Sequence, residues 1–334
     1  MLLSFKDTAS YKILIEYSDF NNDDESNFFN GMTELIFTGE DLGESVITCG
    51  MPAFYIGSKY IDREQEILYK FFLLNTALEA NDAGYLVFSN KIDYLDSTER
   101  GFLNYYVGMF ITKLVSKKIF KFDYLVHLSI AKRYMSIMFR SRKQPDLIAF
   151  NPSDNCYSIF EAKGRSRLDN RILESAKEQV QAISWVRGSK PSNAIVSAVH
   201  PFAVHPFNDV VKCHLKDPKT KEKNNFDISK MRLIWLYYEP IYLLFKKSNA
   251  RNKVYDNLTK EMHYDIQIGE KTILTITMSL ELYKFFSKYN FENEILEEKN
   301  DTYSDNYQDE IMLEEFQKII KESKQLLKIN EKIL

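Results

Sequence analysis

Two short apolar runs separated by a turn-forming segment constrain the fold of this chain more than any other feature of its sequence. Residues 146–150 read DLIAF, residues 151–155 read NPSDN, and residues 156–163 read CYSIFEAK. Because Asn, Pro, Ser and Asp favour turns, this stretch predicts a β-hairpin. In a tight antiparallel hairpin the start of the first strand lies beside the end of the second, so Asp146 and Glu161 become cross-strand neighbours.

The predicted hairpin gathers three charged side chains on one face. Side chains alternate along a strand, so Glu161 and Lys163 point the same way, beside Asp146. Two carboxylates suit Mg²⁺ (or Mn²⁺), which keeps waters for a phosphate ligand, while a lysine stabilises charge that grows on that phosphate. The alternative is that Asp146 caps a turn and the other two side chains form a surface ion pair. Against it, Glu161 closes an apolar run, where an unpartnered carboxylate is costly.

Regular elements are predicted on both sides of this hairpin. A long helix is predicted from Ser97 or Thr98, as N-cap, to about residue 120, because its apolar residues recur at helical spacing. A second helix is predicted over residues 123–139, a third begins near Asp169, and residues 193–202 form a strand. Residues 232–238 are predicted as a strand that enters a helix. These elements give the hairpin a helix-flanked setting.

At these residues the chain resembles the PD-(D/E)xK nuclease superfamily, which includes many restriction and repair endonucleases. The family hallmark is Pro-Asp, a variable spacer, then Asp or Glu, any residue, and Lys. Here it is Pro145-Asp146 followed by Glu161-Ala162-Lys163. Over about residues 99–245 the resemblance implies a restriction-endonuclease-like α/β core, in which helices flank a mixed central sheet in the order α-β-β-β-α-β.

The resemblance also implies site residues on the flanking helices. Glu99 matches the acidic residue of the upstream helix, although a first-turn Glu also suits the helix dipole. Gln179 matches a polar side chain that the following helix aims at the site, although exposed Gln is common in helices. Arg165, Arg167 and Arg171 follow the lysine and are candidate contacts to a nucleic-acid backbone. An ordinary polar loop and helix start is the alternative interpretation of these arginines.

Charge is distributed unevenly along the chain. Residues 101–255 hold 27 Lys and Arg against 12 Asp and Glu, whereas residues 1–100 hold 7 against 18 and residues 256–334 hold 10 against 17. A basic middle between acidic flanks is expected when one segment faces a polyanion, and an unevenly charged solvated surface is the alternative. The expected ligand is DNA, although the sequence does not distinguish DNA from RNA.

These patterns predict four segments. Residues 1–97 form an acidic N-terminal α+β module, with strands over 11–20, 33–40 and 44–50, and residues 98–247 form the nuclease core. Residues 248–291 extend the core, and residues 292–334 form an acidic linker and an amphipathic C-terminal helix over 311–334. The N-terminal module or the C-terminal helix is the expected contact with a protein partner or a second copy.

Other classes of protein are disfavoured. Cys49, Cys156 and Cys213 lie far apart with no CxxC pair, which argues against a disulfide framework and a thiolate zinc site. No run of about 18 apolar residues and no signal-peptide pattern is present, so we expect a cytoplasmic protein that does not enter a membrane. The sequence also lacks a Walker loop, a GxGxxG motif and a nucleophile elbow.

The expected function is therefore a metal-dependent endonuclease that hydrolyses DNA phosphodiester bonds. The superfamily resemblance implies a role such as bacterial restriction or phage defence. The alternative is a non-catalytic nucleic-acid-binding or assembly subunit with a nuclease-like fold. The intact set of Asp146, Glu161 and Lys163 favours the enzyme.

Overall fold

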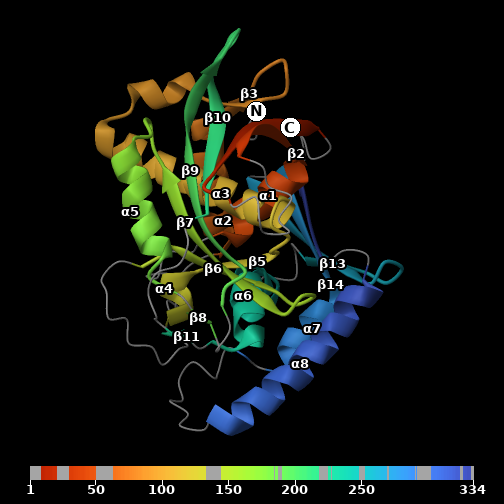
Figure 1. Ribbon diagram of the computed structural model, residues 1–334. Coiled ribbons are helices and arrows are strands. Elements are labelled where there is room, and N and C mark those ends of the chain that lie inside the picture. Colours follow the sequence, from red (N-terminus) through yellow and green to blue (C-terminus); the bar gives the residue numbers. More distant parts are fainter. Residues whose placement is uncertain are drawn as a thin grey trace.

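The computed structural model has a mixed α/β fold, in which helices flank a curled central sheet and a smaller sheet lies beside them (Figure 1). The described residues are 9–20, 30–49, 63–132, 144–183, 185–186, 190–217, 225–226, 228–247, 253–268, 271–289, 291, 302–323 and 326–331.

The central sheet has nine strands. They are β1 (Ser10–Ser18), β2 (Gly31–Thr38), β3 (Leu78–Ala80), β4 (Leu86–Phe88), β5 (Tyr124–His127), β6 (Leu147–Asn151), β7 (Cys156–Gly164), β9 (Asn193–Val204) and β10 (Phe207–Lys216). The main order is β2-β1-β10-β9-β7-β6-β5, and β3 and β4 attach beside β10. β5, β6 and β7 are antiparallel neighbours, β9 is parallel to β7, and β1 is parallel to β10. The hairpin predicted over residues 146–163 is present as β6 and β7.

Helices cover both faces of this sheet. The helices are α1 (Gly39–Thr48), α2 (Arg63–Ala77), the 3₁₀ helix η2 (Asn90–Tyr94), α3 (Ser97–Lys118), α4 (Leu128–Ala131), α5 (Asn170–Val180), α6 (Lys230–Lys247), α7 (Leu280–Tyr289) and α8 (Thr302–Glu322). Gly164 of β7 touches the α3 backbone, whereas its neighbour Lys163 lines a cleft with α5. Since consecutive side chains of a strand point to opposite faces, α3 and α5 lie on opposite sides of β7. No helix among the described residues is long and apolar enough to span a membrane.

Three local predictions were wrong. Where a helix was predicted over residues 123–139, the chain forms strand β5 and the short α4, and residues 133–143 lie outside the described residues. Residues 44–50, predicted as a strand, belong largely to α1, because a capping box between Thr38 and Asp41 starts a helix there. Residues 232–238 lie entirely within α6. The N-cap of α3 also differs from the predicted Ser97 or Thr98: it is Asp96, whose carboxylate accepts the backbone N–H groups of Thr98 and Glu99.

The C-terminal segment also differs from the prediction. α8 begins inside the predicted acidic linker and ends at Glu322, so the predicted helix over 311–334 stops early. The chain then forms β15 (Leu327–Glu331), which pairs with β14 (Lys271–Ser279) in a second sheet completed by β13 (Glu261–Ile268) and β12 (Lys253–Asp256). Phe316 of α8 is fully buried and packs against Tyr124, Tyr238 and Phe285. Phe316 thus anchors α8 to the rest of this chain, whereas Ile311 of the same helix is 43% exposed.

The acidic N-terminal segment shares the central sheet with the rest of the chain. β1 pairs in parallel with β10, where Leu14 lies opposite Lys212 and Ser18 lies opposite Lys216. β2 then forms the outer edge beside β1. Residues 1–97 and 98–247 therefore contribute to one sheet, and the boundaries at residues 97, 247 and 291 stay predictions.

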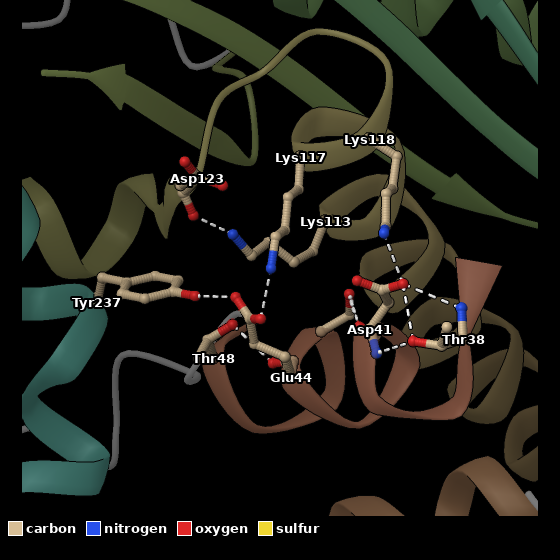
Figure 2. A network of polar contacts seen from close by, with 10 residues as sticks. Thr38, Asp41, Glu44, Thr48, Lys113, Lys117, Lys118, Asp123 and Tyr237 are labelled. Atoms are coloured by element: carbon tan, nitrogen blue, oxygen red, sulfur yellow. Dashed lines mark hydrogen bonds and ion pairs between the residues drawn. The ribbon is translucent and has the colours of Figure 1, made fainter. Parts of the chain in front are cut away.

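A group of charged side chains, buried in part, joins α1 to α3 and α6 (Figure 2). Lys117 Nζ lies 2.5 Å from a carboxylate oxygen of Glu44, and the Tyr237 hydroxyl donates to the other oxygen at 2.6 Å. Lys113 is fully buried, donates to the backbone carbonyl of Asp123, and lies 4.6 Å from the centre of the Tyr237 ring. Removing one partner from a fully buried ion pair costs about 3–5 kcal/mol. The Lys117 side chain is 27% exposed, so we expect a smaller cost here, and the contact links the N-terminal segment to the core.

Lys113 should make the stability of the protein depend on pH. Burial lowers the pKa of Lys113 to about 8, from 10.5 in its ordinary state. Between pH 8 and 10.5 the unfolded chain keeps a proton on Lys113 that the folded protein has released. The free energy of unfolding therefore rises as the pH rises through this range, and this gain is lost as the pH falls through 8. Relative to Lys113→Met, the wild type should gain up to about 3 kcal/mol between pH 8 and 10.5. Urea unfolding of both proteins from pH 7 to 10 measures this, and a constant difference would contradict it.

Candidate active site

Asp146 and Glu161 are held together by reciprocal hydrogen bonds between two strands. Leu147 pairs with Phe160 in the β6–β7 ladder, which places Asp146 opposite Glu161. The backbone N–H of Asp146 donates to Glu161 Oε2 at 2.9 Å, and the backbone N–H of Ala162 donates to Asp146 Oδ2 at 3.2 Å. Each carboxylate thus accepts an N–H from the opposite strand. This exchange fixes both side chains relative to the sheet.

Lys163 completes the cluster that the sequence predicted. Its ammonium forms an ion pair with Glu161 Oε1. The Lys163 side chain is 15% exposed, whereas the Glu161 side chain is fully buried. Burial and the adjacent Asp146 carboxylate raise the pKa of Glu161 to about 8, against the opposing effect of Lys163. Burial and the neighbouring carboxylate thus outweigh the effect of the lysine on the pKa of Glu161.

Asp146 and Glu161 offer carboxylate oxygens, which are the ligand type that a hard divalent cation takes. Asp146 and Glu161 are two neighbouring carboxylates, and no group of three or more His, Cys, Asp and Glu side chains that could hold a metal ion is found among the described residues. Mg²⁺ is commonly bound by one or two carboxylates and keeps several waters, whereas a structural zinc site needs four ligands. Each carboxylate oxygen can accept more than one contact, and a cation would oppose the effects of burial and of the Asp146 charge, which raise the pKa of Glu161.

A cleft opens beside the cluster, between the end of β7 and α5. Its volume is about 370 Å³. Lys163, Arg165 and Arg171 contribute three cations to its walls, against the single carboxylate of Asp169. The other lining residues are Ile172, Ser175 and Gln179. Lys163 of the cluster therefore lines the same cleft as Arg165 and Arg171, two of the three arginines predicted to contact a nucleic-acid backbone.

The remaining predicted residues lie in different settings. Gln179 lines the cleft and donates through Nε2 to the carbonyl of Gln144 at 3.1 Å, which steadies the segment leading into Asp146. Glu99 is exposed, and its carboxylate accepts the backbone N–H of Asp96 in a capping box. Arg167 is exposed and does not line the cleft. The structure therefore places Gln179 beside the cluster and uses Glu99 as a helix cap.

Two glycines bring α3 against the strand that carries Lys163. A Cβ atom on Gly164 would lie 1.6 Å from the carbonyl oxygen of Asn104, and a Cβ on Gly108 would lie 2.6 Å from the backbone nitrogen of Gly164. Asn104 Nδ2 also donates to Ser166 Oγ at 2.8 Å. The helix backbone thus lies directly on β7 where the strand enters the cleft.

Sequence reasoning missed two residues near the carboxylates. Burial raises the pKa of Tyr105, and the charges of Asp146 and Glu161 raise it further. Burial lowers the pKa of His127, while Asp146 acts in the opposite direction. His127 Nε2 lies 3.5 Å from the Tyr105 hydroxyl. A strand predicted over residues 124–127 would have indicated His127, because His127 pairs with Leu147, the residue that follows Asp146.

Comparisons with protein-family models, curated proteins and solved structures found no match to this chain. Any functional assignment therefore depends on the geometry and chemistry of the cluster and its cleft.

Proposed function

We propose that this chain is a metal-dependent endonuclease that hydrolyses DNA phosphodiester bonds at Asp146, Glu161 and Lys163. The observation that carries the proposal is the pair of carboxylates fixed across β6 and β7, with a lysine ammonium on Glu161 and a basic cleft beside it. Hydrolysis of a phosphodiester adds negative charge to a group that is already anionic, so it needs cations at the reacting phosphate.

Each residue has a distinct part in the proposed reaction. Asp146 and Glu161 would hold Mg²⁺ or Mn²⁺, which when bound supplies Lewis-acid activation of the phosphate and of water. Lys163 places a positive charge at the cleft wall, where it stabilises charge that develops on the phosphoryl oxygens. Arg165 and Arg171 bind the flanking phosphates, since guanidinium groups match phosphate geometry.

The order of elements supports a restriction-endonuclease-like core. The resemblance implies α-β-β-β-α-β, and the chain runs α3, β5, β6, β7, α5, β9, with the one-turn helix α4 inserted between β5 and β6 and the two-residue strand β8 (Trp185–Val186) before β9. The antiparallel β5-β6-β7 meander is followed by a crossover through α5 to β9, parallel to β7. β5 is the first strand of this order, at residues where the sequence predicts a helix. Bacterial restriction or phage defence remains the role that this resemblance suggests.

Uptake of a divalent cation tests this function against that of a non-catalytic binding subunit. Calorimetric titration should show Mn²⁺ binding to the wild type and at least about 10-fold weaker binding to Asp146→Asn, because one of two charged ligands becomes neutral. Asp93→Asn, at an exposed position of η2, is the control and should bind as the wild type does. A folded wild type that takes up no Mn²⁺ favours the binding subunit, and unchanged binding by Asp146→Asn places the cation elsewhere.

A further inference from the structure

The β9–β10 hairpin extends beyond the strand that carries the proposed site. β7 ends at Gly164, opposite Val199, whereas β9 continues to Val204 and β10 begins at Phe207. Figure 1 shows this hairpin projecting from the end of the central sheet. The backbone N–H of Arg165 donates to the carbonyl of Val199 at 2.9 Å, which attaches the cleft wall to the base of the hairpin.

The face of the sheet that carries Lys163 continues onto the hairpin. Lys163 pairs with Ala198 of β9. His200 and Phe202 follow at two-residue steps, so their side chains point to the same face as Lys163. Lys212 of β10 lies directly opposite His200. The basic cleft is therefore followed, on one continuous face, by two aromatic rings and another lysine.

The Phe202 ring is held in place by its neighbours. Lys212 Nζ lies 3.9 Å from the ring centre and 2.7 Å from Glu16 Oε2, so the ammonium is fixed between a carboxylate and the ring. The His200 ring lies edge-on at 6.3 Å. Both rings are half-buried and keep part of their surface exposed. A positioned aromatic ring loses little conformational freedom on stacking, which favours binding of a flat ligand.

We propose that the substrate is DNA with an unpaired strand, whose bases stack on Phe202 and His200 while its phosphates lie along Arg165 and Arg171. This inference rests on the proposed nuclease function. Charge favours this ligand, because the cleft has three cations against one carboxylate. Inside a duplex each base is covered by its neighbours, so only an unpaired base offers its face to an aromatic ring. Duplex DNA would gain the phosphate contacts but not the stacking.

Binding to two DNA probes without metal tests the inference separately from catalysis. Fluorescence anisotropy in EDTA would compare a labelled 30-nucleotide oligo-dT strand with a labelled 30-base-pair duplex. Phe202→Ala should weaken binding of the single strand by on the order of 10-fold and leave duplex binding within about 2-fold, as expected for one lost stacking contact. Phe202→Tyr keeps an aromatic ring and should restore single-strand affinity. Tyr94→Ala, at a side chain that is 89% exposed on η2, is the control for loss of a surface aromatic residue.

The outcomes separate the two proposals. Unchanged single-strand binding by a folded Phe202→Ala variant, or equal losses on both probes, would overturn the stacking inference and leave the nuclease proposal standing. If the wild type binds the single strand in EDTA with the expected Phe202 dependence but cuts no DNA with Mg²⁺, the stacking surface is upheld and the nuclease proposal fails. A folded wild type that binds neither probe would overturn both.

Discussion

Lys163→Ala should lower the rate of metal-dependent DNA cleavage by on the order of 10²–10³-fold, the usual cost of removing one electrostatic contact to a reacting group. Lys163 is the only residue of the cluster that also lines the cleft, so its ammonium is the charge placed to meet the reacting phosphate. Its loss also deprives buried Glu161 of its cation. Without Lys163, the pKa of Glu161 should rise further, because the ammonium now acts to lower it.

Asp146→Ala should lower the cleavage rate at least as much, because it removes one of the two proposed cation ligands. Initial rates of nicking of a supercoiled plasmid with Mg²⁺ measure both variants. Lys318→Ala is the matched control, since this lysine is 75% exposed on α8 and should leave the rate unchanged. Circular dichroism confirms that each variant is folded. Cleavage that survives both substitutions in folded protein would place the active site elsewhere.

Gly164→Ala should destabilise the fold by about 3 kcal/mol, the upper end of the usual cost of overpacking. The new Cβ would lie 1.6 Å from the carbonyl oxygen of Asn104 and 2.4 Å from its carbonyl carbon. Both atoms belong to the backbone of α3, so no side-chain rotation relieves the contact. The helix must move away from β7, and Lys163 immediately precedes the displaced residue.

Gly101→Ala provides the control within the same helix. A Cβ at Gly101 meets no atom within 4 Å, and replacing an exposed helical glycine by alanine should stabilise the protein by up to about 1 kcal/mol. Urea unfolding followed by circular dichroism would measure both variants against the wild type. If Gly164→Ala unfolds at the wild-type urea concentration, the close approach of α3 to β7 is wrong.

The hairpin that carries the candidate site could be predicted because its signals are local. The turn residues 151–155 lie between two apolar runs, and the alternation of β7 places Glu161 and Lys163 on one face. Gln179 could be assigned to a helix near the site, but its bond to the Gln144 carbonyl depends on tertiary packing. By sequence Glu99 suited either a site residue or the dipole of the helix N-terminus, and the structure shows it in a capping box with Asp96.

Other features could not be predicted because they depend on distant partners. β1 pairs with β10 across most of the chain, and no local pattern indicates that Leu14 lies opposite Lys212. The residues of β5 have spacing that suits a helix or a strand, and pairing with β6 decides between them. Leu327 and Ile329 were predicted to continue a helix, but pairing with β14 makes this segment a strand.

Cleavage of supercoiled, linear and single-stranded DNA by the wild-type protein, with Mg²⁺, Mn²⁺ or EDTA, tests the central claim most directly. We expect cutting with either cation, none in EDTA, and faster cutting where the DNA contains an unpaired strand. A folded wild type that binds DNA but cuts none of the three forms with either cation would contradict the proposed nuclease.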